Sequence, residues 1–295
     1  LEVPIAGYGR LRLTASDRQD FDDDEIETLG DFAGAIALGY ARFLDLKAIE
    51  AARLREMEEL ERELQVAHDM QMDLLPESTP EVESFDLSGI CVPANHVGGD
   101  YYQYVPIGED GSNLCIVNAD VSGKAMQAAT VAMRFNEMLR YEVQGRSDGV
   151  EILQGLDRSL KGQIPETMFV TCGIGILDPS QRKLSFATAA NPEVYHYVAV
   201  SDEVRPLSIS GCPLGLALDL GDQVPFNSTE ISLSNGDLVV FTSDGVEEAQ
   251  NDSEEFYEGE RLANLIGELG GKGVSADDVR GAIVEDVKRF IGTAP

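Results

Sequence analysis

The chain has 295 residues, 43% of them hydrophobic, which is enough for about two domains with sizeable cores and argues against a largely disordered protein. Asp and Glu number 53 against 22 Lys and Arg, so the formal net charge is -31. A surface of this charge repels phosphate backbones and anionic lipids, so we expect no nucleic-acid partner and no membrane association. The same charge fits both a protein that concentrates cations and one adapted to a salt-rich habitat.

The cysteines predict a cytoplasmic location. Cys91, Cys115, Cys172 and Cys212 form no C-x-x-C pair, and three of them lie in apolar, strand-like runs, so we interpret them as reduced thiols. We find no signal peptide and no apolar run near the roughly 18 residues that a membrane span needs. Because the chain begins at Leu1 and its first residues already have a strand pattern, we expect it to be a piece of a longer protein.

The N-terminal quarter predicts a hairpin followed by one long helix. Residues 1–20 form two short alternating runs around a glycine pair, and residues 21–25 are an acidic helix start. From Phe43 to Pro76, apolar residues recur at spacings of three and four between charged flanks. This pattern over 43–75 is typical of a short parallel coiled coil and predicts a homodimer. The alternative is an amphipathic helix packed on its own domain.

After Pro76 the chain changes to short strand patterns and amphipathic helices. Strand patterns come before and after a central helical pair, which predicts a layered arrangement of helices and sheets instead of alternating βαβ units. We expect strands at 86–94, 100–106, 113–121, 168–178, 183–189, 194–200 and 237–243, and helices at 123–143, 150–161, 259–269 and 275–291.

Three aspartates lie where a strand pattern meets glycine. Asp100 follows Gly98-Gly99, Asp120 ends a strand pattern just before Ser122-Gly123, and Asp244 precedes Gly245. Carboxylates at strand ends are rigidly placed, and several that converge form a hard-oxygen site suited to Mg²⁺ or Mn²⁺. Each Asp-Gly pair by itself is more often a turn, but the three together favour a cation site.

Together these motifs resemble the SpoIIE/RsbU-type PPM (PP2C-like) protein serine phosphatases, and the first 45 residues more weakly resemble the end of a GAF sensor domain. We therefore expect a GAF fragment at 1–42, a coiled-coil helix at 43–76 and a phosphatase domain at 77–295. The resemblance to the phosphatases rests on Ala67-His68-Asp69-Met70-Gln71, Leu74-Leu75-Pro76, Val97-Gly98-Gly99-Asp100-Tyr101, Ala119-Asp120-Val121-Ser122-Gly123-Lys124, Pro213-Leu214-Gly215 and Ser243-Asp244-Gly245.

The resemblance implies an α+β fold, a PP2C-like α-β-β-α sandwich, and a site that holds two Mn²⁺ or Mg²⁺ ions. In such a site Asp120 bridges both ions, Asp100 and the carbonyl oxygen of Val121 bind one of them, and Asp244 binds the other. The implied reaction is hydrolysis of phosphoserine on a regulatory protein of the anti-anti-sigma (STAS) type. The alternative is a catalytically inactive module that binds a partner and relays a sensor signal. A calcium-binding protein is disfavoured because the sequence has no D-x-[DN]-x-[DN]-G loop.

Three departures from the family pattern bear on this expectation. The chain has Ala189-Ala190-Asn191-Pro192 where Ala-Gly-His-Pro is common, and Ala125 where glycine is frequent. The family pattern also ends with an Asp-Asp-x-Thr motif and a final strand, and the chain stops at Pro295 before both. If that pattern holds, the ion between Asp120 and Asp244 lacks a carboxylate, so we expect this piece to be a poor phosphatase.

Overall fold

The computed structural model divides the chain into two compact units, residues 1–64 and 65–295. It describes residues 2–5, 7–12, 14, 22–93, 98–108, 110–123, 125–190, 193–216 and 226–292.

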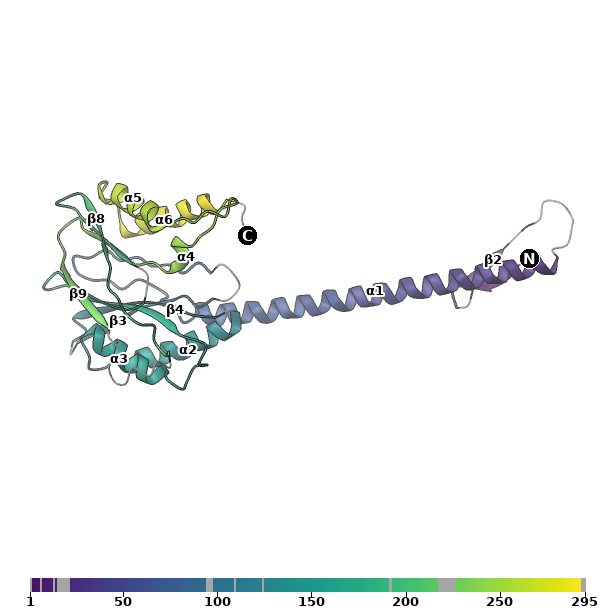
Figure 1. The fold of residues 1–295 in the computed structure, drawn as a ribbon, viewed down its shortest axis with the longest axis horizontal. Coiled ribbons are helices and arrows are strands. Elements are labelled where there is room, and N and C mark those ends of the chain that lie inside the picture. The colour runs from purple at the N-terminus through teal and green to yellow at the C-terminus, as the bar shows by residue number, and fades with distance from the viewer. Residues whose placement is uncertain are drawn as a thin grey trace. The chain divides into compact units, whose positions relative to one another are not determined.

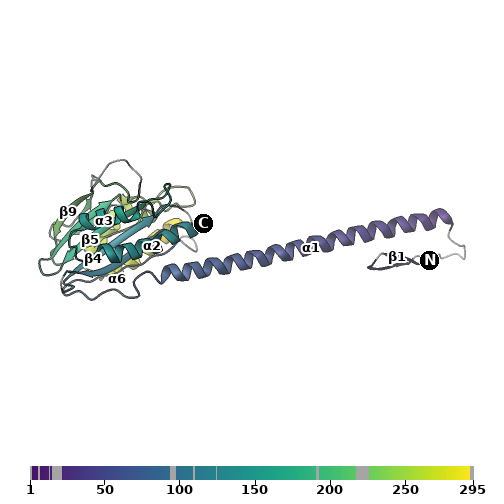
Figure 2. The same cartoon turned by 90° about the horizontal axis from the view of Figure 1, so that it is seen from below.

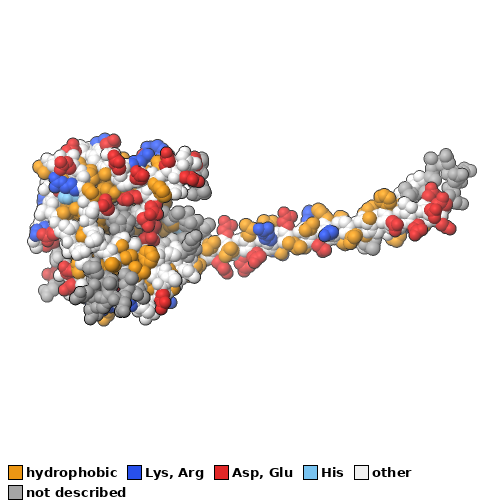
Figure 3. All heavy atoms as spheres, viewed as in Figure 1, with side chains coloured by type: hydrophobic (Ala, Val, Ile, Leu, Met, Phe, Trp, Pro, Cys, Tyr) orange, Lys and Arg blue, Asp and Glu red, His pale blue; other side chains and the backbone are white. Residues whose placement is uncertain are grey.

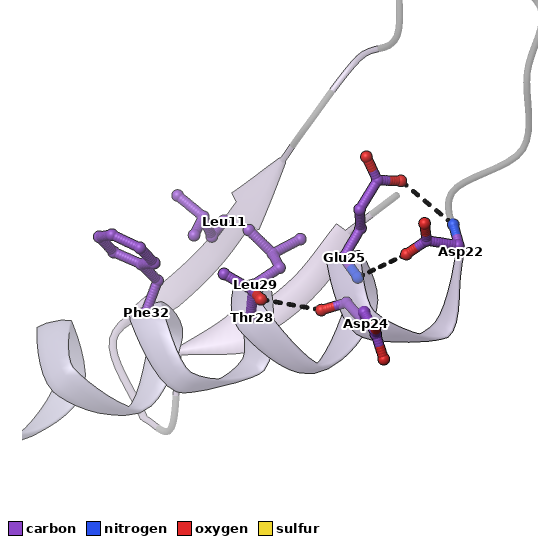
Figure 4. A pocket seen from close by; sticks show the side chains of 7 residues that line it. All are labelled: Leu11, Asp22, Asp24, Glu25, Thr28, Leu29 and Phe32. Carbon is purple, nitrogen blue, oxygen red and sulfur yellow. Dashed lines mark hydrogen bonds between the residues drawn. The ribbon is translucent and has the colours of Figure 1, made fainter.

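The N-terminal unit is a β-hairpin and most of one long helix. Strands β1 (Glu2–Ile5) and β2 (Gly9–Arg12) pair antiparallel, and helix α1 spans Asp23–Met72. A capping box starts the helix, because the Asp22 carboxylate accepts from the Glu25 amide while the Glu25 carboxylate accepts from the Asp22 amide (Figure 4). A hollow of about 530 Å³ lies beside this start, lined by residues of β2 and of the first turns of α1.

The C-terminal unit contains two antiparallel sheets (Figures 1 and 2). The larger has the strand order β3-β4-β5-β6-β9, and the smaller has the order β10-β7-β8. The strands of the larger sheet are β3 (Tyr101–Ile107), β4 (Asn113–Val121), β5 (Val170–Asp178), β6 (Lys183–Ala189) and β9 (Asn227–Ser232). Those of the smaller sheet are β7 (Val194–Val198), β8 (Glu203–Leu207) and β10 (Leu238–Val240).

Helices cover the outer face of each sheet (Figure 1). Helices α2 (Ala125–Glu142) and α3 (Gly149–Leu160) pack on the five-stranded sheet, and α5 (Gly259–Gly270) and α6 (Ala276–Ile291) cover the three-stranded one. The short α4 (Asp244–Glu247) follows β10.

Three apolar clusters hold these layers together. One lies between α2, α3 and the larger sheet, and another lies between α5, α6 and the smaller sheet. The third includes Leu114, Leu184 and Phe241 and fills the space between the two sheets. Alternate residues of β4 belong to the first and third clusters, as expected for a strand buried on both faces. The layers are therefore helix, sheet, sheet, helix, which confirms the predicted α-β-β-α sandwich.

The strand predicted over 86–94 is wrong for the described residues 86–93, which form no ladder. Their polar groups bind helix α6 instead: the Asp86 carboxylate accepts from the Ala276 amide at 2.8 Å, and the Ser88 hydroxyl donates to Asp277 at 2.5 Å. Two strands, β8 and β9, were not predicted; each lies at a sheet edge.

The four cysteines are free, and Cys115 and Cys172 are buried while Cys91 and Cys212 are partly buried. Within the described ranges, no helix combines the length and the apolar composition needed to cross a membrane.

Candidate metal centre

Strand β4 places Asp120 near the end of a central strand, facing the second sheet. Cys115, Val117 and Ala119 are fully buried on the face covered by the helices. Because side chains alternate along a strand, Asn118 and Asp120 belong to the opposite face, between the sheets. Asp120 is paired with Thr171 of β5, so its backbone is fixed within the ladder.

Asp100 comes directly before β3, and a close backbone contact brings it to Asp120. The Val121 amide donates to the Gly99 carbonyl at 3.2 Å. A Cβ atom on Gly99 would overlap the Val121 carbonyl oxygen and the Asp120 Oδ1, and would lie 2.9 Å from the Val121 nitrogen. Only glycine fits this approach, which explains why glycine precedes Asp100 in the sequence.

A hydrogen bond between the sheets brings Asp244 to the same place. The Asn118 side-chain amide donates to the Thr242 carbonyl at 2.7 Å. Asn118 lies two residues before Asp120, and Thr242 lies two residues before Asp244. The bond therefore joins the end of β4 to the segment between β10 and α4, which leads to Asp244. Sequence analysis assigned no role to Asn118 or Thr242.

The three carboxylates lie close enough to affect one another's ionisation. The pKa of Asp120 is raised to about 6, first by burial and then by the neighbouring carboxylates of Asp100 and Asp244. The pKa of Asp100 is also raised, first by burial and then by Asp244, while the Ser243 hydroxyl opposes the shift. Asp100 Oδ1 is buried and has no hydrogen-bond partner among the described residues. An unpartnered buried oxygen among like charges is a site that a cation would stabilise.

The donor set fits a hard divalent cation that takes only part of its ligands from side chains. Among the described residues, no group of three or more His, Cys, Asp or Glu side chains is arranged to hold a metal ion alone. Mg²⁺ is usually bound through one or two carboxylates, with waters and substrate oxygens completing its shell. The carboxylates of Asp100 and Asp120 and the Val121 carbonyl oxygen are ligands of this type. Lys124, Asn191 and Pro192 lie outside the described residues.

Cys91 lies near this centre but is not a reactive thiolate. Burial raises the pKa of its thiol to about 12, and the Asp100 carboxylate contributes to the same shift. A thiol with this pKa stays protonated at neutral pH and is a poor nucleophile.

Sequence reasoning missed two side chains that hold the loop before β3. Gln71, near the end of α1, is buried and forms two hydrogen bonds with Gly98. Asn136 of α2 is buried and accepts a hydrogen bond from the Tyr101 hydroxyl at 2.7 Å. Sequence analysis placed Gln71 on the seam of the long helix and within a family motif, and assigned it no contact. A polar side chain on an apolar seam was the available signal.

Comparison with known proteins gives consistent matches. The family model "Stage II sporulation protein E (SpoIIE)" matches residues 110–295. The phosphoserine phosphatase RsbU of Bacillus subtilis (strain 168) is 27% identical over 243 residues, which cover 81% of this chain and 68% of RsbU.

Two solved structures resemble the fold. The SiaA-PP2C domain of Pseudomonas aeruginosa has a TM-score of 0.65 at 20% identity, with 81% of this chain and 93% of that chain covered. The PP2C phosphatase domain of SpoIIE from Bacillus subtilis, with a fragment of its regulatory domain, has a TM-score of 0.54 at 16% identity, with 65% of this chain and 53% of that chain covered. These structures show that the α-β-β-α sandwich is of the PP2C type.

Proposed function

The chain belongs to the SpoIIE family of PP2C-like (PPM) protein phosphatases, and from this membership we propose that it is a metal-dependent protein serine/threonine phosphatase. The observation that carries the proposal is the convergence of Asp100, Asp120 and Asp244, which the contacts of Gly99 with Val121 and of Asn118 with Thr242 bring about. Burial, and then the neighbouring carboxylates, raise the pKa of Asp100 and Asp120. A module that only bound a partner would gain nothing from placing three carboxylates together against their mutual repulsion.

We assign the carboxylates to two Mn²⁺ or Mg²⁺ ions. Asp120 would contribute to both ion sites, Asp100 and the Val121 carbonyl oxygen would hold one ion, and Asp244 would hold the other. Support comes from the unpartnered Asp100 Oδ1 and from the backbone contact that sets Gly99 against Val121. When bound, such ions activate a water for attack and neutralise charge on the phosphoryl oxygens.

The chain's own residues hold this centre rigidly. Asp120 is fixed by its strand, and the Asn118 amide ties the strand end that precedes Asp244. With a pKa of about 6, Asp120 is mostly ionised at neutral pH, and a bound cation favours that state further. The protonated Cys91 thiol does not compete as a nucleophile, which agrees with direct attack by water.

The proposed substrate is phosphoserine on a small regulatory protein of the STAS type, in a cytoplasmic partner-switching pathway. The curated relative RsbU is named a phosphoserine phosphatase, and it aligns with 81% of this chain. The four free thiols agree with a reducing compartment. The net charge of -31 disfavours nucleic acid and anionic membranes as partners.

The helix at 43–75 is proposed to form a parallel coiled coil between two copies of the chain. Apolar side chains along it are exposed in the single chain, including Leu46 at 62%, Met57 at 58% and Leu60 at 56% (Figure 3). They follow a heptad seam with Glu and Arg on its flanks, so a second identical helix is the occupant that fits both the spacing and the charge. The preceding hairpin and helix start, residues 1–42, are proposed to be the C-terminal part of a GAF-like sensor.

Two aspartate variants test the proposed function. Asp120→Asn should weaken Mn²⁺ binding in calorimetry and hydrolysis of p-nitrophenyl phosphate more than Asp244→Asn does, because Asp120 contacts both ions. EDTA should abolish the hydrolysis by wild type. Mn²⁺ binding by Asp120→Asn as tight as that of wild type would refute the assignment. Wild-type protein that binds a phosphorylated partner but releases no phosphate with Mn²⁺ would establish the inactive module instead.

A further inference from the structure

Gln71 makes a two-way hydrogen-bonded contact with the backbone of Gly98. Its Nε2 donates to the Gly98 carbonyl at 2.8 Å, and its Oε1 accepts from the Gly98 amide at 3.1 Å. The side chain is 4% exposed, so water does not readily replace these bonds. The contact joins the penultimate residue of α1 to a loop 27 positions further along the chain.

The bound loop carries Asp100. Gly98 is two residues before Asp100, and between them Gly99 packs its backbone against Val121. On the other side of Asp100, the Tyr101 hydroxyl is held by Asn136 of α2. Asp100 therefore lies between two anchored residues, one tied to α1 and the other to α2.

We infer that Gln71 is a positioning residue for Asp100 and so sets the affinity of the proposed metal centre. The inference rests on the proposed function, since it requires Asp100 to be a metal ligand. An amide supplies the donor and the acceptor that the two backbone groups of Gly98 need. An apolar side chain of the same length supplies neither, so Asp100 then loses its anchor on α1 and its position is less precisely fixed.

A neighbouring contact also holds α1 at this point. One turn before Gln71, the small residue Ala67 packs on Ala129 of α2, and both are buried. Gln71 therefore stands on a part of α1 whose placement within the C-terminal unit is fixed.

The test compares Gln71→Met with the matched control Gln65→Met, which makes the same change on the same helix at an exposed site. Calorimetric titration with Mn²⁺ should show a dissociation constant about tenfold higher for Gln71→Met and unchanged for Gln65→Met. Hydrolysis of p-nitrophenyl phosphate should need more Mn²⁺ but reach within about twofold of the wild-type kcat at saturation. A lower melting temperature with wild-type Mn²⁺ affinity would mean a merely structural role and would overturn the inference.

Two further variants keep the test decisive. Gln71→Asn retains the amide but is one methylene shorter, so it should also weaken Mn²⁺ binding, by at least threefold; wild-type affinity in this variant would overturn the inference even if Gln71→Met does not fold. Asp100→Asn separates the two proposals. If it weakens Mn²⁺ binding and the Gln71 variants do not, the inference fails and the proposed function stands. If Asp100→Asn also binds Mn²⁺ as wild type does, the assigned metal centre itself is wrong.

Discussion

Gly99→Ala should disrupt the metal centre although it adds a single methyl group. The added Cβ would overlap the Val121 carbonyl oxygen and lie 2.9 Å from the Val121 nitrogen, and backbone atoms cannot rotate away as a flexible side chain can. Relief requires the loop to move, which breaks the hydrogen bond from the Val121 amide to Gly99 and costs about 1 kcal/mol. Overpacking costs a further 1–3 kcal/mol or so, while the stiffer unfolded chain returns roughly 0.4–1 kcal/mol.

The net loss for Gly99→Ala is therefore about 1–3 kcal/mol of unfolding free energy, or a melting temperature lower by roughly 3–10 °C for a domain of this size. Because the Asp100 loop can no longer lie against Asp120 and Val121, Mn²⁺ binding should weaken by at least about tenfold, roughly 1.4 kcal/mol. Gly98→Ala is the matched control, since its Cβ would meet nothing closer than the Asp100 nitrogen at 3.9 Å. Calorimetry and thermal unfolding on both variants decide the matter. Wild-type Mn²⁺ affinity and melting temperature in Gly99→Ala would refute this reasoning.

Two further predictions concern the helix seam and the stability of the smaller sheet's helices. Replacing Leu60 and Leu64 with Lys should give monomers in sedimentation, because like charges would face each other across the seam; a wild type that is already monomeric would contradict the coiled coil. Hydrogen bonds from Arg261 and Tyr257 lower the pKa of Asp286 in the folded protein, although partial burial opposes the shift. The Asp286 carboxylate therefore stabilises the fold fully above the ordinary pKa of 3.8. This stabilisation is lost as the pH falls through the lower pKa of the folded protein. Asp286→Asn should therefore lower the melting temperature at neutral pH, and its difference from wild type should close below pH 3.8; a difference that stays constant would show that the charge is not the cause.

The interior strands could be predicted from the sequence, and the edge strands could not. Strands β4, β5 and β6 are buried on both faces, so their apolar runs are long and clear. Strand β8 contains Pro206, and β9 reads Asn227–Ser232 with mostly polar residues, because an edge strand faces solvent and has one unpaired side. The segment at 86–93 has an alternating pattern, but its partner is helix α6, about 190 residues away in the sequence. No local pattern shows such a contact.

The candidate site was predictable where a carboxylate follows a strand pattern, and not where a side chain binds backbone. Asp100 and Asp244 stand beside glycine, Asp120 ends a strand pattern three residues before Gly123, and the structure places all three within electrostatic reach of one another. The roles of Gln71 and Asn118 depend on backbone carbonyls and amides, which every residue possesses, so the sequence does not show which of these groups each side chain binds. Their recognition required the tertiary structure.

The hydrogen bond between Asn118 and Thr242 has a consequence for ion selection. Two stacked sheets slide over one another more easily than strands separate within a sheet, because apolar contacts have no preferred direction. The hydrogen bond from the Asn118 amide opposes such sliding two residues away from Asp120 and from Asp244. Ligand distances for Mg²⁺ are near 2.1 Å and tolerate little error, whereas Ca²⁺ accepts about 2.3–2.6 Å in a flexible shell. We therefore expect the proposed ion site to be rigid, which suits Mg²⁺ better than Ca²⁺.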